Sequence, residues 1–155
     1  MQKCCYETLS KKNFIKVLDT SIFYKSFFNF TDHISSYRKT PFNINDFISE
    51  NNNNFNQLNY HILKNKKDII GFCSTEKLMN DTIYLSSYIV NPFYRGMCYN
   101  NFFMKKITNN LKLNYHKIEL KVHEDNIKAL NSYLSNDYFI INKENKRYIM
   151  NKILR

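Results

Sequence analysis

Arg95 and Gly96 lie between a predicted strand that ends at Val90 and a predicted helix that opens near Met97. The entrance of a helix leaves four backbone N–H groups without partners and carries roughly half a positive charge. Gly96 lets an anion approach the backbone closely, and the guanidinium of Arg95 offers a planar fork of donors that suits phosphate oxygens. This stretch therefore predicts a binding site for a phosphorylated ligand.

Three predicted elements position this site and carry further candidate residues. The helix after the loop is predicted over residues 97–114, because apolar residues recur there every four positions. A strand follows over residues 118–122, where apolar and charged residues alternate, and it leads to His123. The next helix is predicted over residues 126–135, with Asp125 or Asn126 as its N-cap.

The remaining elements are predicted from the same kinds of pattern. Residues 4–9 fit a short strand, a helix begins after Ser10, and a second short helix is expected around residues 34–38 or 43–50. The polar stretch at residues 51–54 indicates an exposed loop. Further strands, separated by turns, are expected at residues 58–62, 69–74, 83–90, 138–141 and 148–154.

The element order is therefore β-α-α-β-β-β-α-β-α-β-β, which predicts an α/β (α+β) fold. The three middle strands form an antiparallel meander, and the last two form a hairpin. Gly71, inside the second strand of the meander, indicates a bulge or a close backbone approach. With 155 residues, 43% of them hydrophobic, the chain is expected to form one domain over residues 1–155.

The formal net charge of +10 favours polyanionic ligands. The basic residues are mostly Lys, and Asn, Ile, Tyr and Phe are abundant, so a compositional bias that scatters Lys over the surface explains the charge equally well. No run of five or six like charges marks a nucleic-acid-binding tail, and nucleic acid is therefore not an expected partner.

Cysteine and histidine spacing argues against a metal site. The four cysteines show neither metal-ligand nor disulfide-framework spacing, and the four histidines form no HxH or HExxH pair. The chain has no apolar signal core and no run of 18 apolar residues. We expect no metal, no membrane association and a cytoplasmic, or alternatively nuclear, location.

Residues 90–100 resemble motif A of the GNAT superfamily, the acetyl-CoA-dependent N-acetyltransferases. In that motif a strand and a Pro precede Arg/Gln-x-x-Gly-x-Gly/Ala, at the start of the helix that holds the CoA pyrophosphate. Arg95 matches, whereas Cys98 and Asn100 stand where the family prefers small residues. The resemblance implies that acetyl-CoA is the co-substrate. The residues that it implies for acetyl-CoA binding are Ile89, Val90, Arg95, Gly96, Met97, Cys98, Tyr99, Asn100, Asn101, Asn126 and Tyr133.

Residues 120–139 resemble motif B of the same family, a strand followed by Asn-x-x-Ala-x-x-x-Tyr and Gly-Phe. Asn126, Ala129 and Tyr133 match at the right spacing, while Tyr138 replaces the Gly. The resemblance implies a mixed central sheet of about six to seven strands flanked by helices. It also implies a splay between the fourth and fifth strands that admits the pantetheine arm.

The family resemblance implies a catalytic role for Tyr133, and the position of His123 after the fifth strand makes it a candidate base, with a purely structural role as its alternative. Tyr133 stands at the position of the usual general acid, and its phenol could protonate a departing thiolate. The alternative for Tyr133 is a packing role. The fourth strand offers no carboxylate base, so His123 is the candidate base, with Glu124 and Glu76 as candidates acting through water.

The acceptor is predicted from a local resemblance. Residues 9–18 and 111–120 look like segments of glucosamine 6-phosphate N-acetyltransferases, although Leu130 stands where those enzymes carry their Tyr. This implies a role in UDP-GlcNAc biosynthesis, with Arg38, Lys39 or Lys77 as phosphate partners and a possible homodimer. The alternatives are acetylation of a protein N-terminus or lysine, and a non-catalytic basic binding module.

Overall fold

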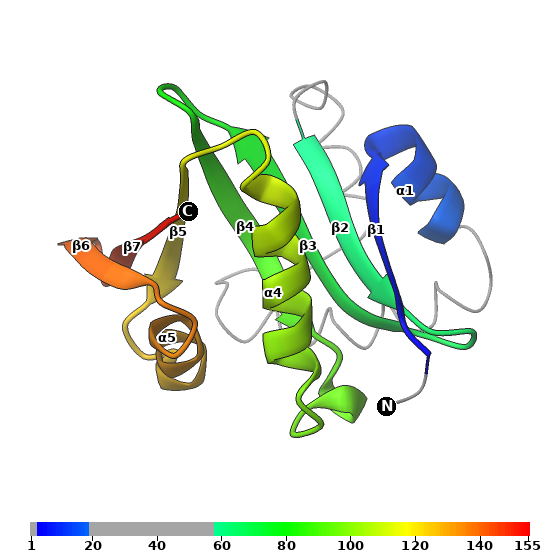
Figure 1. Cartoon of the computed structure of the whole chain (residues 1–155). Helices are drawn as coiled ribbons and strands as arrows, with labels where there is room; N and C mark the ends of the chain where they lie inside the picture. The colour runs from blue at the N-terminus through cyan, green and yellow to red at the C-terminus, as the bar shows by residue number, and fades with distance from the viewer. Residues whose placement is uncertain (1–2, 19–57) are drawn as a thin grey trace.

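The computed structural model describes residues 3–18 and 58–155, which form one mixed seven-stranded sheet flanked by helices (Figure 1). The strand order is β1-β2-β3-β4-β5-β7-β6, and every neighbouring pair is antiparallel except β4 and β5. The α+β class and the mixed sheet are confirmed. The strands are β1 (Cys5–Ser10), β2 (Leu58–Lys64), β3 (Ile69–Lys77), β4 (Thr82–Val90), β5 (Lys117–His123), β6 (Phe139–Glu144) and β7 (Arg147–Ile153).

The described helices follow the predicted order. They are α1 (Lys11–Leu18), the 3-10 helix η2 (Pro92–Tyr94), α4 (Tyr99–Leu111) and α5 (Ile127–Leu134). Helix α4 is shorter than the predicted helix over residues 97–114 and ends three residues earlier, at Leu111. It begins two residues later than predicted, because Cys98 adopts a left-handed conformation with φ 62° and cannot be part of the helix. The predicted short helix, the polar loop at 51–54, and Arg38 and Lys39 lie outside the described residues.

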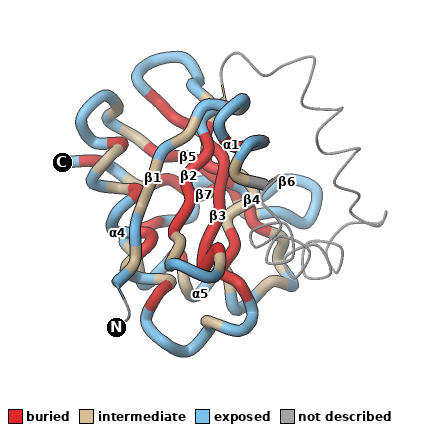
Figure 2. Tube along the Cα trace, turned by 90° about the vertical axis from the view of Figure 1, so that its right-hand side faces the viewer, coloured by how far each residue is buried: buried red, intermediate tan, exposed pale blue. Residues whose placement is uncertain are grey.

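Helices α4 and α5 cover one face of the sheet, and α1 packs against the other (Figure 1). Cys73 belongs to the core under α4, whereas its neighbour Phe72 stacks on Phe14 of α1 at 5.1 Å between ring centroids. Neighbouring residues of a strand point to opposite faces, so the two helices lie on opposite sides. Figure 2 shows the buried residues gathered in the inner strands, while β6 is exposed along its length.

The predicted apolar face of α4 is confirmed and explains Gly71. Phe103, Ile107 and Leu111 are buried against the sheet. A Cβ at Gly71 would lie 2.7 Å from Cδ1 of Phe103, so any other residue would collide with the ring. The β2–β3 register shifts between Leu63, the partner of Gly71, and Lys64, the partner of Ile69, so β3 carries the predicted bulge next to Gly71. The approaching group is a side-chain ring rather than backbone.

Strands β4 and β5 separate soon after they meet, as expected. Their parallel pairing covers only residues 82–84 of β4 and 117–119 of β5, although β4 continues to Val90 and β5 to His123. Ser87 has φ 51° and lies where β4 carries an extra residue opposite β3. A bulge of this kind bends its strand and increases the twist. The bulge therefore accounts for the divergence of β4 from β5.

A buried polar cluster joins the first three strands. His61 of β2 is 1% exposed, and its ring nitrogens lie 2.7 Å from the hydroxyl of Tyr6 and 2.9 Å from that of Thr75. Burial lowers the pKa of His61 from 6.5 to about 4. The imidazole is therefore neutral in the folded protein and bridges hydroxyls of β1 and β3.

We predict that folding stability falls as the pH is lowered from 6.5 to 4. In that window the unfolded chain binds a proton at His61 and the folded chain does not, so acid favours unfolding. The expected loss is about 3 kcal/mol, measured as the free energy of unfolding in urea at each pH. Carboxylates also titrate in this range, so the informative quantity is the difference between the wild type and His61→Gln. The exposed His116, changed to Gln, should leave the pH dependence intact; an equal loss of pH dependence in both variants would contradict the assignment.

Candidate functional site

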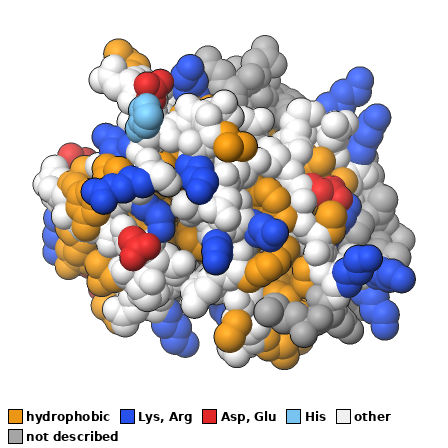
Figure 3. Space-filling model, in the orientation of Figure 1, with side chains coloured by type: hydrophobic (Ala, Val, Ile, Leu, Met, Phe, Trp, Pro, Cys, Tyr) orange, Lys and Arg blue, Asp and Glu red, His pale blue; other side chains and the backbone are white. Residues whose placement is uncertain are grey.

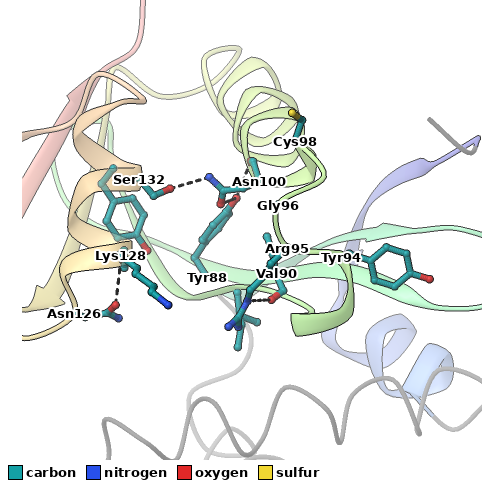
Figure 4. Close-up of a pocket in the computed structure, with 13 residues that line it drawn as sticks. Tyr88, Val90, Tyr94, Arg95, Gly96, Cys98, Asn100, Asn126, Lys128 and Ser132 are labelled. Carbon is teal, nitrogen blue, oxygen red and sulfur yellow. Dashed lines mark hydrogen bonds between the residues drawn. The ribbon is translucent and has the colours of Figure 1, made fainter.

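A cavity of about 250 Å³ lies between the C-terminal end of β4, the start of α4, and α5 (Figure 4). It brings together residues from both predicted motifs, which are more than 25 positions apart in the chain. Hereafter we name it the motif cavity. Its lining residues are Tyr88, Ile89, Val90, Tyr94, Arg95, Gly96, Cys98, Asn100, Asn126, Lys128, Ala129, Ser132 and Tyr133.

Three residues of the predicted cofactor set are not among these lining residues. Met97 points outward with 56% of its surface exposed, Tyr99 is buried in the core under α4, and Asn101 is exposed. Contact between these three residues and a ligand in the cavity would therefore have to come from the backbone. Conversely, Lys128, Ser132 and Tyr94 line the cavity and were not predicted.

The loop before α4 forms an open cradle for an anion. Gly96 has φ 76°, and apart from its chain neighbours no atom of the described residues lies within 4 Å of the position that a Cβ would take. Cys98 is the N-cap of α4, and its side chain makes no capping hydrogen bond, so the first-turn N–H groups are not capped by it. Arg95 donates from Nε to the carbonyl of Val90 at 3.0 Å, which fixes the guanidinium beside the end of β4.

Asn91 holds this loop in place. It is 1% exposed, its side-chain oxygen accepts from the N–H of Phe93 at 3.1 Å, and its amide donates to the carbonyl of Ile69 at 3.1 Å. The first bond caps η2 and the second ties the loop to β3. Sequence reasoning missed this role, although Asn before Pro is a recognisable turn signal.

Asn100 links α4 to both β4 and α5 across one wall of the cavity (Figure 4). Its amide donates to the hydroxyl of Ser132 at 2.8 Å. Its side-chain and backbone oxygens accept from the hydroxyl of Tyr88, at 3.1 and 3.0 Å. The ring of Tyr88 stacks on Phe103 at 5.5 Å, so this network connects the cavity wall to the core.

Tyr133 is 8% exposed and lines the motif cavity. No hydrogen bond to its hydroxyl is found within residues 3–18 and 58–155. Burial raises the pKa of Tyr133, so the phenol keeps its proton at neutral pH. The ring lies among other aromatic side chains, 6.1 Å from Tyr88 and 5.5 Å from Tyr138. Asn126 accepts from the N–H of Ala129 at 3.2 Å, which confirms its predicted capping of α5.

A second cavity, of about 290 Å³, adjoins the motif cavity at the divergence of β4 and β5. We name it the splay cavity. The two cavities share five lining residues, so they meet at a common boundary: Tyr88, Ile89, Asn126, Ala129 and Tyr133. The other lining residues of the splay cavity are Tyr84, Leu85, Ser86, Ser87, Lys121, Val122, His123 and Arg147.

Of the three predicted bases, His123 alone is among the lining residues of the motif cavity or the splay cavity. Its Nδ1 lies 3.5 Å from the carboxylate of Asp125. Glu124 forms an ion pair with Lys143, whose hydrogen bond lowers the pKa of Glu124 and keeps it ionised. Glu76, near the end of β3, is not among the lining residues of either cavity. His123 is therefore the predicted base that the fold brings into the same cavity as Tyr133.

On the face that carries α4 and α5, Lys and Arg side chains lie scattered among hydrophobic and uncharged polar groups (Figure 3). In the part of the chain that the structure describes, no group of three or more His, Cys, Asp or Glu could hold a metal ion. None of the described helices has the length and apolarity needed to cross a membrane.

Comparison with known proteins identifies a family for most of the chain and a shared fold for nearly all of it. The model of the family described as Acetyltransferase (GNAT) family matches residues 22–138. A search of curated proteins finds no match. Among solved structures, a GNAT-family acetyltransferase from Staphylococcus aureus Mu50 matches with a TM-score of 0.73 and 14% identity, over 99% of this chain and 100% of that one.

Two further structures support the same fold. The ribosomal-protein-S18-alanine N-acetyltransferase of Escherichia coli matches with a TM-score of 0.71 and 13% identity, over 98% of this chain and 94% of that one. The spermidine N-acetyltransferase of Vibrio cholerae, solved with CoA and spermine, matches with a TM-score of 0.71 and 15% identity. The match covers 97% of this chain and 95% of the Vibrio cholerae chain. At these identities the matches show a shared fold.

We predict that Cys98→Gly stabilises the protein by about 1 kcal/mol, because the left-handed conformation disfavours a Cβ. Equilibrium unfolding in urea measures the change. Cys98→Ala is the matched control, since it removes the thiol but keeps the Cβ. An equal gain in Cys98→Ala would mean that the thiol, and not the backbone conformation, is responsible.

Proposed function

Because this chain belongs to the acetyltransferase (GNAT) family, whose members use acetyl-CoA, we propose that it moves the acetyl group to a primary amine by direct transfer in a ternary complex. The observation that carries the proposal is the place of Tyr133 at the boundary of two adjoining cavities. One cavity suits the phosphorylated co-substrate, and the other can receive the amine. The acceptor and the site residues remain our proposal.

The motif cavity fits the co-substrate chemically. A pyrophosphate would lie against the first turn of α4 and the cradle at Gly96, where N–H groups and the helix dipole favour an anion. Lys128 lines the same cavity and would add a positive charge. Beyond residue 84, the side of β4 that faces β5 lacks strand pairing, so the backbone of Ile89 can bond the amides of the pantetheine arm.

The acetyl transfer needs a neutral amine, a polarised carbonyl and a stabilised leaving thiolate. The amine nitrogen attacks the carbonyl carbon, a C–N bond forms, and the C–S bond breaks with its electron pair leaving on sulfur. We propose that a backbone N–H of Ile89 or Val90 donates to the carbonyl oxygen, a contribution of a few kcal/mol in comparable oxyanion sites.

In this proposal Tyr133 stabilises the leaving sulfur. Because burial raises the pKa of Tyr133, its phenol is protonated at any physiological pH and can donate a hydrogen bond as charge develops on sulfur. Proton transfer then completes the departure of CoA. His123, in the splay cavity, is the proposed acceptor of the amine proton.

For the acceptor, glucosamine 6-phosphate is our best single candidate. Its support is the sequence resemblance at residues 9–18, most of which form α1. Lys77, one predicted phosphate partner, is not among the lining residues of either cavity. A protein N-terminus or lysine is the alternative acceptor, and one structural neighbour is described as acting on an alanine of ribosomal protein S18.

We also propose a cytoplasmic, or alternatively nuclear, location and a homodimer. The exposed edge strand β6 supports the homodimer. It carries Phe139, Ile140 and Ile141, each 44–48% exposed, and its outer edge has no strand partner among the described residues. Exposed apolar edges of this kind are suited to pairing with a second chain.

We predict release of free CoA thiol when the protein is mixed with acetyl-CoA and glucosamine 6-phosphate. The measurement is thiol-reagent absorbance, run in parallel with a panel of peptides bearing free N-termini or lysines. Turnover on the sugar phosphate and not on peptides supports the small-molecule acceptor. Turnover on peptides alone rejects the sugar phosphate and retains the acetyl transfer.

We predict that Tyr133→Phe lowers kcat by about 10²- to 10⁴-fold with little change in acetyl-CoA affinity, because only the proton donor is lost. Steady-state kinetics and calorimetric binding of CoA measure the two quantities. The matched control is Tyr138→Phe, which removes the hydroxyl of a neighbouring buried Tyr that donates to Met104 and lines neither cavity. Equal kcat values in the two variants would show that the hydroxyl of Tyr133 has no specific role in the reaction.

A further inference from the structure

The two residues with a permanent charge that line the splay cavity are both basic, Lys121 and Arg147, and His123 lies beside them. Lys121 and His123 lie at the end of β5, and Arg147 begins β7 as the Cα partner of His123. No carboxylate is among the lining residues, although the protein carries 13 Asp and Glu. The wall therefore gathers positive charge beside the predicted general acid.

The three basic side chains differ in the ion-pair and hydrogen-bond partners that they have within the protein. Lys121 forms an ion pair with Glu144 at 3.6 Å, and His123 lies 3.5 Å from Asp125. Arg147 has no ion pair and no side-chain hydrogen bond within the described residues, and it lies across the β6–β7 pairing from Glu144. Glu144 already pairs with Lys121, so the guanidinium donors of Arg147, an exposed residue, are available to a ligand.

Arg147 lies in the same cavity as the proposed general acid. Arg147 and Tyr133 line the same cavity, and Tyr133 also lines the motif cavity. A molecule small enough for about 290 Å³ that reaches Arg147 would thus have its other end near the boundary with the motif cavity. A guanidinium presents two parallel N–H donors that match a carboxylate or phosphate, and a polycation would be repelled.

We propose that Arg147, with Lys121 beside it, forms an anion subsite for the acceptor, so that the preferred substrate is a small amine bearing a phosphate or a carboxylate. The proposal rests on the proposed function, since it assigns the splay cavity to the acceptor. It places the anionic group at β7 and the amine at the cavity boundary. The subsite also disfavours polyamines and Lys-rich protein tails as acceptors.

The test measures binding rather than turnover, so that it is independent of the proposed reaction. Dissociation constants are determined by calorimetry or NMR for two matched pairs: glucosamine 6-phosphate with glucosamine, and alanine with alaninamide. The wild type is compared with Arg147→Gln. The matched control is Lys146→Gln, which removes the same charge from the neighbouring exposed residue that lines neither cavity.

We expect the wild type to bind one anionic member at least ten-fold more tightly than its neutral partner, and Arg147→Gln to lose about ten-fold for that member only. The pair that discriminates tells a phosphate from a carboxylate. Lys146→Gln should bind like the wild type. Equal binding within both pairs, equal losses in both variants, or no binding of any probe would overturn the subsite. CoA release from any amine, measured separately, would still support the acetyl transfer in that case.

Discussion

The separation of β4 from β5 is the constraint on which the rest of the site depends. Two parallel strands that stop pairing after residue 84 leave backbone groups of β4 without a strand partner, inside the sheet rather than at its edge. Buried backbone groups require hydrogen-bond partners, and here a ligand that lies along β4 can supply them. The bulge at Ser87 is what turns β4 away and keeps the gap open. The two cavities meet at this gap.

A gap in a sheet weakens the fold unless other contacts hold the separated parts, and two contacts do so here. Phe103 of α4 lies directly over Gly71 of β3, so the helix is fixed close to the sheet on the β4 side. Asn100 then carries hydrogen bonds from α4 to Ser132 of α5, on the far side of the gap. Helix α4, whose first turn faces the cradle at Gly96, is thereby attached to both halves of the sheet. These contacts set the position of the start of α4 relative to α5, which carries Tyr133.

Periodicity predicted the elements that have one buried face, because alternation and four-residue spacing directly record burial. It placed the strands and the apolar face of α4 correctly. It could not place the start of α4, because the left-handed Cys98 depends on the loop geometry and not on side-chain pattern. Nor could it find the His61 cluster, whose three members come from strands that only the fold brings together. Lys128 was missed because a Lys on a helix is normally solvated, and only the position of α5 directs it to the cavity.

The net charge of +10 and the charge at the site are separate properties of this chain. Lys residues are scattered over the α4 and α5 face, and at exposed positions their fields are screened by salt within about 10 Å. A scattered excess of this kind assists encounter with anions in general and selects no particular one. Selection requires a cation in a defined position with donors that the protein leaves open, in a cavity that limits the size of the ligand. Arg147 is also exposed, but it lines the splay cavity and makes no ion pair among the described residues, so we propose that this one side chain selects the acceptor more than the overall charge does.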